Sequence, residues 1–327
     1  MNTNNYDTGW ADLIKKGDRR ALSRAITLAE SSKNEDRQIL QRLFEGEMPN
    51  ENTFRIAVSG PPGVGKSTFI DHFGASLAEN NNVAVLTIDP SSPRSGGSIL
   101  GDKTRMEQLS MLPNVYIRPS PGGKGYGGIS PYSSDVIRLC EMAGYNIIIL
   151  ETIGVGQSET LARQLTDHFV LLLLAGGGDD LQGIKRGIME LADTFVFNKA
   201  DNTPENVMKK ALSDLNTALH LLRSEETKPG VFSVSALNKL GMKAVESHIM
   251  EVMNNEKNTT LWKARRVRQD VARFQFLIEQ EMLRLVYSEA KLKDKYINLE
   301  SEVFASKLSV NQAVEKFMKY FREFGKK

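Results

Sequence analysis

One short stretch constrains the fold of this chain more than any other. From Ile56 to Ser67 the sequence is IAVSGPPGVGKS, in which an apolar segment leads into Gly60, and four residues separate this glycine from Gly65, Lys66 and Ser67. This spacing is typical of a phosphate-binding P-loop, where backbone N–H groups and the lysine bind a polyphosphate and the serine binds Mg²⁺. Strand-like and helical apolar patterns flank the stretch, which an ordinary Gly/Pro turn would not need. The residues expected to bind a nucleoside triphosphate are Gly60, Pro61, Pro62, Gly63, Val64, Gly65, Lys66, Ser67 and Thr68.

Composition places the chain among ordinary globular proteins. Its 327 residues, 40% hydrophobic and 25% charged, suffice for one large α/β core with appendages or for two modest domains. A net charge of +2 without basic runs argues against a nucleic-acid partner. No apolar run is long enough to span a membrane and the N-terminus has no signal-like segment, so we expect a cytoplasmic protein without membrane association. The single cysteine, Cys140, and four scattered histidines argue against disulfides and metal cages.

The order of apolar patterns along the chain predicts its architecture. Between residues 54 and 255, short apolar runs alternate with helical patterns. Such alternation predicts an α/β fold with a mostly parallel sheet flanked by helices, and ligands at the carboxyl ends of the strands. We expect an N-terminal helical extension over 1–50, the P-loop domain over 51–256 and a C-terminal helical arm over 257–327. The apolar stripe of the arm either packs on the chain's own core or forms a homodimer.

Carboxylates that follow two predicted strands suggest a metal site. One apolar strand ends in Glu151, which could bind Mg²⁺, and the backbone N–H of Gly154 could approach the γ-phosphate. Another strand runs into Asp89 and a glycine-containing segment with Asp102, a pattern that suits a switch ordering around metal and phosphate. Asp102 could equally cap the following helix, and the two roles are compatible. The predicted metal ligands are Ser67, Asp89, Asp102 and Glu151.

A third polar cluster indicates which base the nucleotide carries. A strand ending at Phe197 leads into Asn198, Lys199 and, one residue further, Asp201, the N-K-x-D arrangement of guanine-binding proteins. The aspartate can accept from the ring N–H and the exocyclic amine of guanine, a donor pair that adenine lacks, while the lysine stem covers the base. The cluster therefore favours GTP over ATP. Backbone N–H groups that could contact the guanine carbonyl follow the next strand, in Ser235, Ala236 and Leu237.

A glycine-rich loop from Ala175 to Gly187, AGGGDDLQGIKRG, follows a hydrophobic strand. So many glycines allow a conformational freedom that a static connector would not need. Lys185 or Arg186 could supply the cation that stabilises transferring phosphate charge. The alternative is a surface loop without a role in the chemistry.

Longer stretches surround these motifs. They are GDRRALSRAITLAES at Gly17–Ser31, SGPPGVGKST, DPSSPRSGGSILGDKTRM, ETIGVGQSE, GGGDDLQGIKRGIMELAD and NKAD. In combination they resemble the MeaB/ArgK GTPases, chaperones of methylmalonyl-CoA mutase and related adenosylcobalamin-dependent acyl-CoA mutases, once described as lysine/arginine/ornithine transport kinases. The chain departs from that family at Pro121–Gly128, PGGKGYGG, where the family usually carries a serine-arginine pair, and it matches only loosely after Asn254.

The resemblance implies a P-loop GTPase domain of the SIMIBI class, an N-terminal helical extension and a C-terminal dimerisation arm. It implies switches at 89–105 and 151–159, and an additional switch at 176–187 that faces the mutase. Together with the motifs, it predicts slow Mg²⁺-dependent GTP hydrolysis by in-line attack of water, with Lys66, Glu151 and Lys185 as catalytic residues.

The resemblance also implies a partner. Nucleotide state would gate cofactor loading into an adenosylcobalamin-dependent acyl-CoA mutase of the methylmalonyl-CoA mutase type, or protect that mutase. Three alternatives stay open. One is a metal-delivery maturation GTPase, which should display Cys/His ligands. The others are a kinase acting on a basic amino acid transport system and an adaptor that binds GTP without turnover.

Overall fold

The computed structural model describes residues 9–31, 33–47, 52–89, 106–121, 133–152, 158–176, 186–222, 229–259 and 261–324. The chain divides into two compact units, Met1–Arg266 and Val267–Lys327. The domain boundaries expected at residues 50 and 256 stay a prediction. Among the helices that the structure describes, none is both long and apolar enough to cross a membrane.

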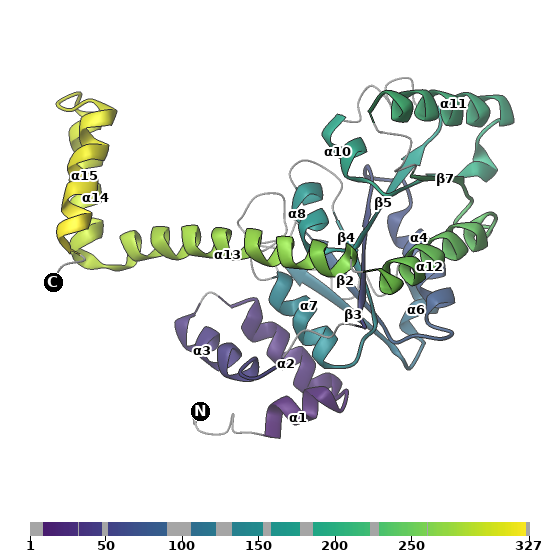
Figure 1. Cartoon of the computed structure of the whole chain (residues 1–327), viewed down its shortest axis with the longest axis horizontal. Coiled ribbons are helices and arrows are strands. Elements are labelled where there is room, and N and C mark those ends of the chain that lie inside the picture. Colours follow the sequence, from purple (N-terminus) through teal and green to yellow (C-terminus); the bar gives the residue numbers. More distant parts are fainter. Residues whose placement is uncertain are drawn as a thin grey trace. The chain divides into compact units, whose positions relative to one another are not determined.

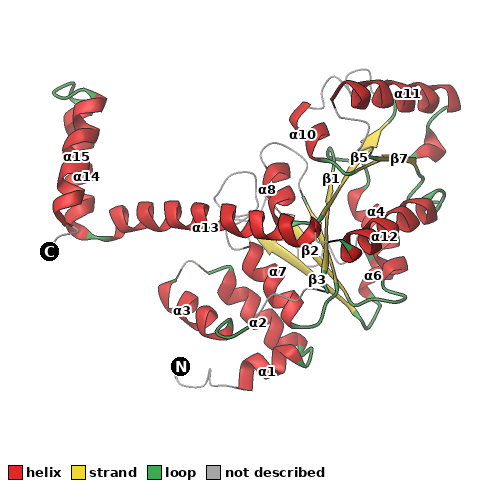
Figure 2. Ribbon diagram, viewed as in Figure 1, coloured by secondary structure: helices red, strands yellow, loops and turns green. Residues whose placement is uncertain are grey.

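A parallel sheet forms the centre of the first unit (Figures 1 and 2). Its seven described strands follow the order β3-β2-β4-β1-β5-β6-β7, and every pair is parallel. The predicted α/β fold with a mostly parallel sheet flanked by helices is therefore confirmed. The strands are β1 (Phe54–Ser59), β2 (Val83–Asp89), β3 (Val115–Pro121), β4 (Ile147–Glu151), β5 (His168–Leu174), β6 (Thr194–Asn198) and β7 (Gly230–Ser233).

Helices cover both faces of this sheet, and each face has its own hydrophobic core. Because side chains alternate along a strand, Ala57 of β1 belongs to one core and its neighbours Ile56 and Val58 to the other. The helices of the first unit are α1 (Gly9–Lys15), α2 (Arg19–Ala29), α3 (Asn34–Leu43), α4 (Lys66–Leu77), α6 (Glu107–Ser110), α7 (Ser133–Met142), α8 (Ser158–Leu165), α10 (Arg186–Leu191), η2 (Ala200–Asn202), α11 (Glu205–Leu222) and α12 (Met242–Asn258).

The N-terminal helices pack on the core through one apolar face. Leu22 and Ile26 of α2 are fully buried in the same cluster as Leu139 of α7 and Tyr116 of β3. Asp18 caps α2, because its carboxylate accepts from the backbone N–H groups of residues 20 and 21. This face therefore fixes α2 beside the edge of the sheet.

The sheet order explains where the nucleotide motifs meet. β1, which leads into the P-loop, lies between β4 and β5, and Val58 of β1 is in register with Glu151 of β4. On the other side of β4, Thr87 of β2 is also in register with Glu151. The carboxyl ends of β1, β2 and β4 therefore lie side by side.

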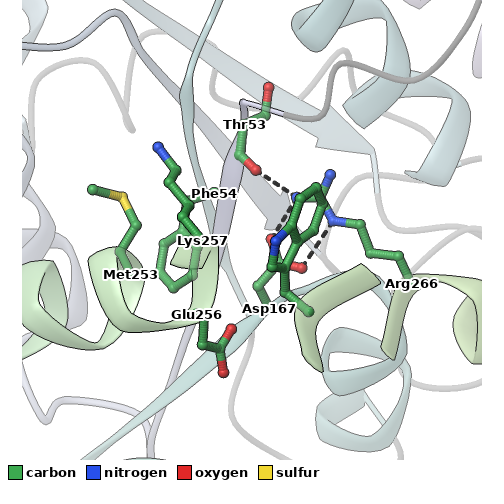
Figure 3. A pocket seen from close by; sticks show the side chains of 8 residues that line it. Thr53, Phe54, Asp167, Met253, Glu256, Lys257 and Arg266 are labelled. Atoms are coloured by element: carbon green, nitrogen blue, oxygen red, sulfur yellow. Dashed lines mark hydrogen bonds and ion pairs between the residues drawn. The ribbon is translucent and has the colours of Figure 1, made fainter. Parts of the chain in front are cut away.

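A buried ion pair joins the start of α13 (Leu261–Ser288) to the residues at the amino ends of β1 and β5 (Figure 3). Arg266 donates from Nε to Asp167 Oδ1 at 3.0 Å and from Nη2 to Asp167 Oδ2 at 2.6 Å. It also donates to the Thr53 carbonyl just before β1, and it stacks 4.7 Å from the Trp262 ring centroid. Asp167 Oδ2 accepts a further bond from the backbone N–H of Arg55. The first turns of α13 are therefore fixed to the residues that precede β1 and β5.

The second unit consists of the rest of α13 with α14 (Ala290–Phe304) and α15 (Val310–Phe324). Its aromatic contacts join the three helices, with ring centroids 5.4 Å apart for Tyr287 and Tyr296 and 6.2 Å apart for Tyr296 and Phe317. The predicted apolar stripe of α13 is largely exposed in the single chain, at 52% for Val271 and 65% for Phe274. This part of the stripe is therefore an exposed apolar surface of the second unit.

Candidate nucleotide site

The loop between β1 and α4 adopts backbone conformations that favour glycine. The φ angle is +152° at Gly60, +78° at Gly63 and +93° at Gly65. A Cβ atom would lie 2.5 Å from the Leu172 carbonyl oxygen at Gly60 and 2.7 Å from Asn198 Nδ2 at Gly65. Side chains at these two positions would push the loop away from β5 and β6. The glycine spacing of the sequence motif is thus required by the local geometry.

The start of α4 and Lys66 offer positive charge beside this loop. The N-cap of α4 is a glycine without a side-chain cap, so the first N–H groups of the helix are suited to binding an anion. Lys66 Nζ donates to the carbonyl oxygens of Gly60 at 2.8 Å and Pro61 at 3.2 Å. Burial lowers the pKa of Lys66, against the opposing effect of the Glu151 and Glu159 carboxylates. The ammonium group therefore lies against the loop, where a phosphate would bind.

A serine and a glutamate expected to bind the metal are in direct contact. Ser67 Oγ, in the first turn of α4, donates to Glu151 Oε1 at 3.1 Å. The strand end behind them is held in place because Thr152 donates from its backbone to Val58 and from Oγ1 to Ser59 Oγ at 2.8 Å. These two oxygen atoms, both hard metal ligands, therefore lie together at the start of α4, the helix that follows the P-loop.

These donors fit Mg²⁺ in the way that nucleotide sites use it. Magnesium favours oxygen ligands, keeps several waters and is bound through one or two protein groups plus phosphate oxygens. In the described part of the chain, no group of three or more His, Cys, Asp or Glu residues could hold a metal ion by itself. Ser67 and Glu151 could therefore hold Mg²⁺ together with a nucleotide.

Asn198 joins the P-loop to the residues expected to bind guanine. Its side chain is buried at the end of β6, and Nδ2 donates to the Val64 carbonyl of the P-loop at 2.8 Å. Its Oδ1 accepts from the backbone N–H of Ala236, after β7, at 3.0 Å. One amide therefore bridges two backbone segments that lie far apart in the sequence, and the phosphate and base regions form one site.

The other residues expected to bind guanine lie in the segments next to Asn198 and Ala236. Lys199 has a left-handed backbone with a φ angle of +60°, which turns the chain into the short helix η2 and leaves Asp201 exposed. Ser235 is fully buried, and its Oγ accepts from the backbone N–H of Asn238, while Leu237 is 70% exposed. The turn after β7 is thus fixed from within, and Asp201 is open to a ligand.

Several predicted site residues cannot be placed in this arrangement. Asp102, Gly154 and Lys185 lie outside the described residues. Asp89 is described by its backbone alone, as the last residue of β2, two residues beyond the Thr87 that pairs with Glu151. The proposed roles of these four residues stay predictions.

The sequence motifs did not reveal two contacts of the site. The bridge made by Asn198 needs the Val64 carbonyl and the Ala236 N–H to meet, and nothing local in the sequence brings them together. The bond between Thr152 and Ser59 is similar, although two hydroxyl residues at the ends of two predicted strands were a usable signal.

Comparison with known proteins identifies the family. Residues 22–291 match the family model described as methylmalonyl-CoA mutase-associated GTPase MeaB. The mouse protein named methylmalonic aciduria type A homolog, mitochondrial, is 40% identical over 323 residues, covering 94% of this chain and 78% of the mouse protein. GTPase ArgK of Escherichia coli (strain K12) is 45% identical over 242 residues, which are 73% of each chain.

A solved structure agrees with the fold. The crystal structure of a LAO/AO transport system kinase has a TM-score of 0.73 and 29% sequence identity, and the match covers 98% of this chain and 99% of that one. The family match extends from α2 into α14 and so includes the P-loop, the Ser67–Glu151 pair and the Asn198 bridge. The chain therefore belongs to the MeaB family of methylmalonyl-CoA mutase-associated GTPases, and it is a GTP hydrolase that binds guanine nucleotides.

Proposed function

We propose that this GTPase uses Mg²⁺ and that its nucleotide state regulates an adenosylcobalamin-dependent acyl-CoA mutase of the methylmalonyl-CoA mutase type. The observation that carries the first part is the contact between Ser67 Oγ and Glu151 Oε1 beside the Lys66 ammonium. The second part is supported by the family description and by the name of the mouse relative.

In the proposed reaction, each residue has one task at the phosphates. Lys66 leaves its two carbonyl acceptors and donates to the β- and γ-phosphate oxygens, while the first N–H groups of α4 bind the same charge. Ser67 and Glu151 hold Mg²⁺, which when bound neutralises charge on the phosphate oxygens. Lys185 supplies a further cation to the transferring phosphoryl group. An attacking water completes the in-line displacement.

The residues that follow β6 select the base of the nucleotide. Asp201 accepts from the ring N–H and the amine of guanine, and the stem of Lys199 covers the ring. The Asn198 bridge links this segment to the P-loop, so that a base and a triphosphate bound at the two ends stabilise one arrangement.

The proposed assembly is a homodimer formed through α13. Its exposed stripe, including Val271 at 52%, Phe274 at 65% and Ile278 at 46% exposure, presents an apolar surface that a second copy would cover. Sedimentation tests this directly, because Phe274→Glu should convert a dimer to a monomer while Arg268→Glu, a charge change on the same helix, should not. A wild-type monomer at micromolar concentration would contradict the proposal.

The central experiment follows γ-labelled GTP with and without a purified methylmalonyl-CoA mutase. We expect label to appear as free phosphate, at a rate that the mutase changes. We expect the GTP-bound and GDP-bound forms to capture unequal amounts of the mutase. Label transferred to protein would indicate a kinase instead. If neither form captured the mutase, the proposed partner would be contradicted, while the GTPase activity would be unaffected.

A further inference from the structure

A second concave site lies between α2 and the edge strand β3. It is a cavity of about 740 Å³ whose lining shares no residue with the nucleotide site. Three of its arginines, Arg19, Arg20 and Arg24, come from the stretch GDRRALSRAITLAES, which has no task in the proposed reaction. A fourth, Arg118, comes from β3. We call this the basic cavity.

Two of the arginines build the walls of the basic cavity. Arg19 Nη2 donates to the backbone carbonyls of Pro113 and Val115, the latter at 2.7 Å, which ties the start of α2 to the start of β3. Arg118 Nη2 pairs with Glu30 Oε2 at 2.7 Å, which ties β3 to the other end of α2. The cavity is therefore preformed, with contacts at both ends of the helix.

The cavity carries more positive charge than its own contacts use. Glu30 pairs with Arg118, whereas Arg19, Arg20 and Arg24 form no ion pair with a described carboxylate. Arg20 makes no side-chain hydrogen bond or ion pair to any described residue, and Arg24 only stacks 5.9 Å from the Trp10 ring centroid. The Nε atom of Arg118 is buried and has no hydrogen-bond partner among the described residues. Donors and charge remain available to a ligand.

Hydroxyl groups extend this donor set. Ser23 Oγ and Tyr116 Oη lie 3.0 Å apart in the lining of the cavity. Burial raises the pKa of Tyr116 to about 12, with nearby Arg118 opposing the shift. The phenol therefore stays protonated at neutral pH and can donate a hydrogen bond.

We propose that the basic cavity binds a small molecule that carries a phosphate or diphosphate group. Guanidinium groups match phosphate oxygens with paired, charge-assisted hydrogen bonds. The cavity volume falls within the range of roughly 300–1,000 Å³ that small-molecule sites occupy.

The size of the cavity favours this ligand over an acidic protein segment. From Arg19 to Arg24 the helix rises only about 8 Å at 1.5 Å per residue. An extended peptide covers that length with two or three residues. A diphosphate with an attached organic group fills the same length and brings enough charge to match the arginines.

The test is calorimetric titration of inorganic pyrophosphate into the full chain saturated with GDP and Mg²⁺, so that the P-loop is filled. We expect one further site per chain. The double variant Arg20→Gln/Arg24→Gln should weaken this site at least about tenfold, because each lost charge-assisted bond contributes to affinity. Arg42→Gln removes an exposed arginine of α3 that is not in the cavity lining and should change the affinity less than about twofold.

The same titration in the Lys66→Ala variant distinguishes a site in the basic cavity from the nucleotide site. In Lys66→Ala, the site in the basic cavity should persist even though the P-loop is impaired. The proposal is overturned if the GDP-loaded chain binds no pyrophosphate, or if the double variant binds it as tightly as wild type with an unchanged unfolding transition. It is also overturned if poly-glutamate binds in an arginine-dependent way and pyrophosphate does not, since the site would then receive a protein segment.

Discussion

Removing one partner of the buried ion pair between Arg266 and Asp167 should strongly destabilise the first unit. Their side chains are only 11% and 1% exposed, and Arg266 makes two bonds to the carboxylate. Arg266→Met keeps much of the side-chain length but takes both guanidinium bonds from the buried Asp167 carboxylate, which still accepts from the Arg55 N–H. Breaking one side of a buried pair costs about 3–5 kcal/mol. For a unit of this size the melting temperature should fall by roughly 6–20 °C.

The double variant Asp167→Asn/Arg266→Met separates charge from packing. It removes both charges of the pair, and the amide oxygen can still accept from the Arg55 N–H. The buried Glu141 loses the Arg266 charge 4.0 Å away but keeps its 2.7 Å ion pair with Arg55, so the free energy of unfolding should recover to within about 2 kcal/mol of wild type. Lys209→Met is the matched control. It breaks an exposed pair with Glu205, whose side chains are 72% and 82% exposed, and should cost less than about 1 kcal/mol.

The assay is a urea titration followed by tryptophan fluorescence. The chain has two tryptophans, and both Trp10 and Trp262 belong to the first unit, so the signal reports that unit alone. If Arg266→Met lost no more stability than Lys209→Met, the buried charge of Asp167 would not carry the predicted cost. If the double variant were as unstable as the single one, loss of packing rather than an unpaired charge would explain the effect.

Three other perturbations test the site and its surroundings. Lys66→Ala should lower GTP turnover at least about 100-fold without changing the unfolding transition, because two charged hydrogen bonds to phosphate are lost, and a phosphate-release assay checks this. Asn198→Ala leaves the Ala236 N–H and the P-loop carbonyl buried without partners at about 1–3 kcal/mol each, so calorimetry should show GTP binding at least about tenfold weaker. Burial lowers the pKa of His168 to about 4, from the ordinary value of about 6.5. Between those pH values the unfolded chain binds a proton that the folded chain does not, so stability should fall by up to about 3 kcal/mol as the pH falls, and urea titrations of His168→Gln should lack this part of the change.

Local patterns predicted the fold well because they are repeated along the chain. Apolar runs with strand character alternate with helical stripes, and this alternation suffices for a parallel sheet covered on both faces. The P-loop was also predictable, since its glycines are close in sequence and each has a steric reason that the structure shows at Gly60 and Gly65.

Contacts between distant segments could not be predicted in the same way. Arg266 and Asp167 are separated by nearly a hundred residues, and only the folded chain shows that one compensates the other. The same holds for Asn198, which the motif assigned to the base and which also bonds to the P-loop. The apolar stripe of α13 had two possible partners in the sequence, its own core or a second copy, and its pattern alone could not distinguish them.

The most direct test of the guanine-nucleotide site is a change of base specificity at Asp201. The carboxylate presents two acceptors to the two donors of guanine, whereas Asn presents one acceptor and one donor, which match the ring N–H and the carbonyl of xanthine. Leaving buried polar groups unpaired discriminates strongly between such bases. Hydrolysis of GTP and XTP should be measured side by side for wild type and Asp201→Asn. The substitution should lower kcat/KM for GTP at least about 100-fold and raise it for XTP. An unchanged ratio of GTP to XTP hydrolysis would contradict the assignment of guanine recognition to Asp201.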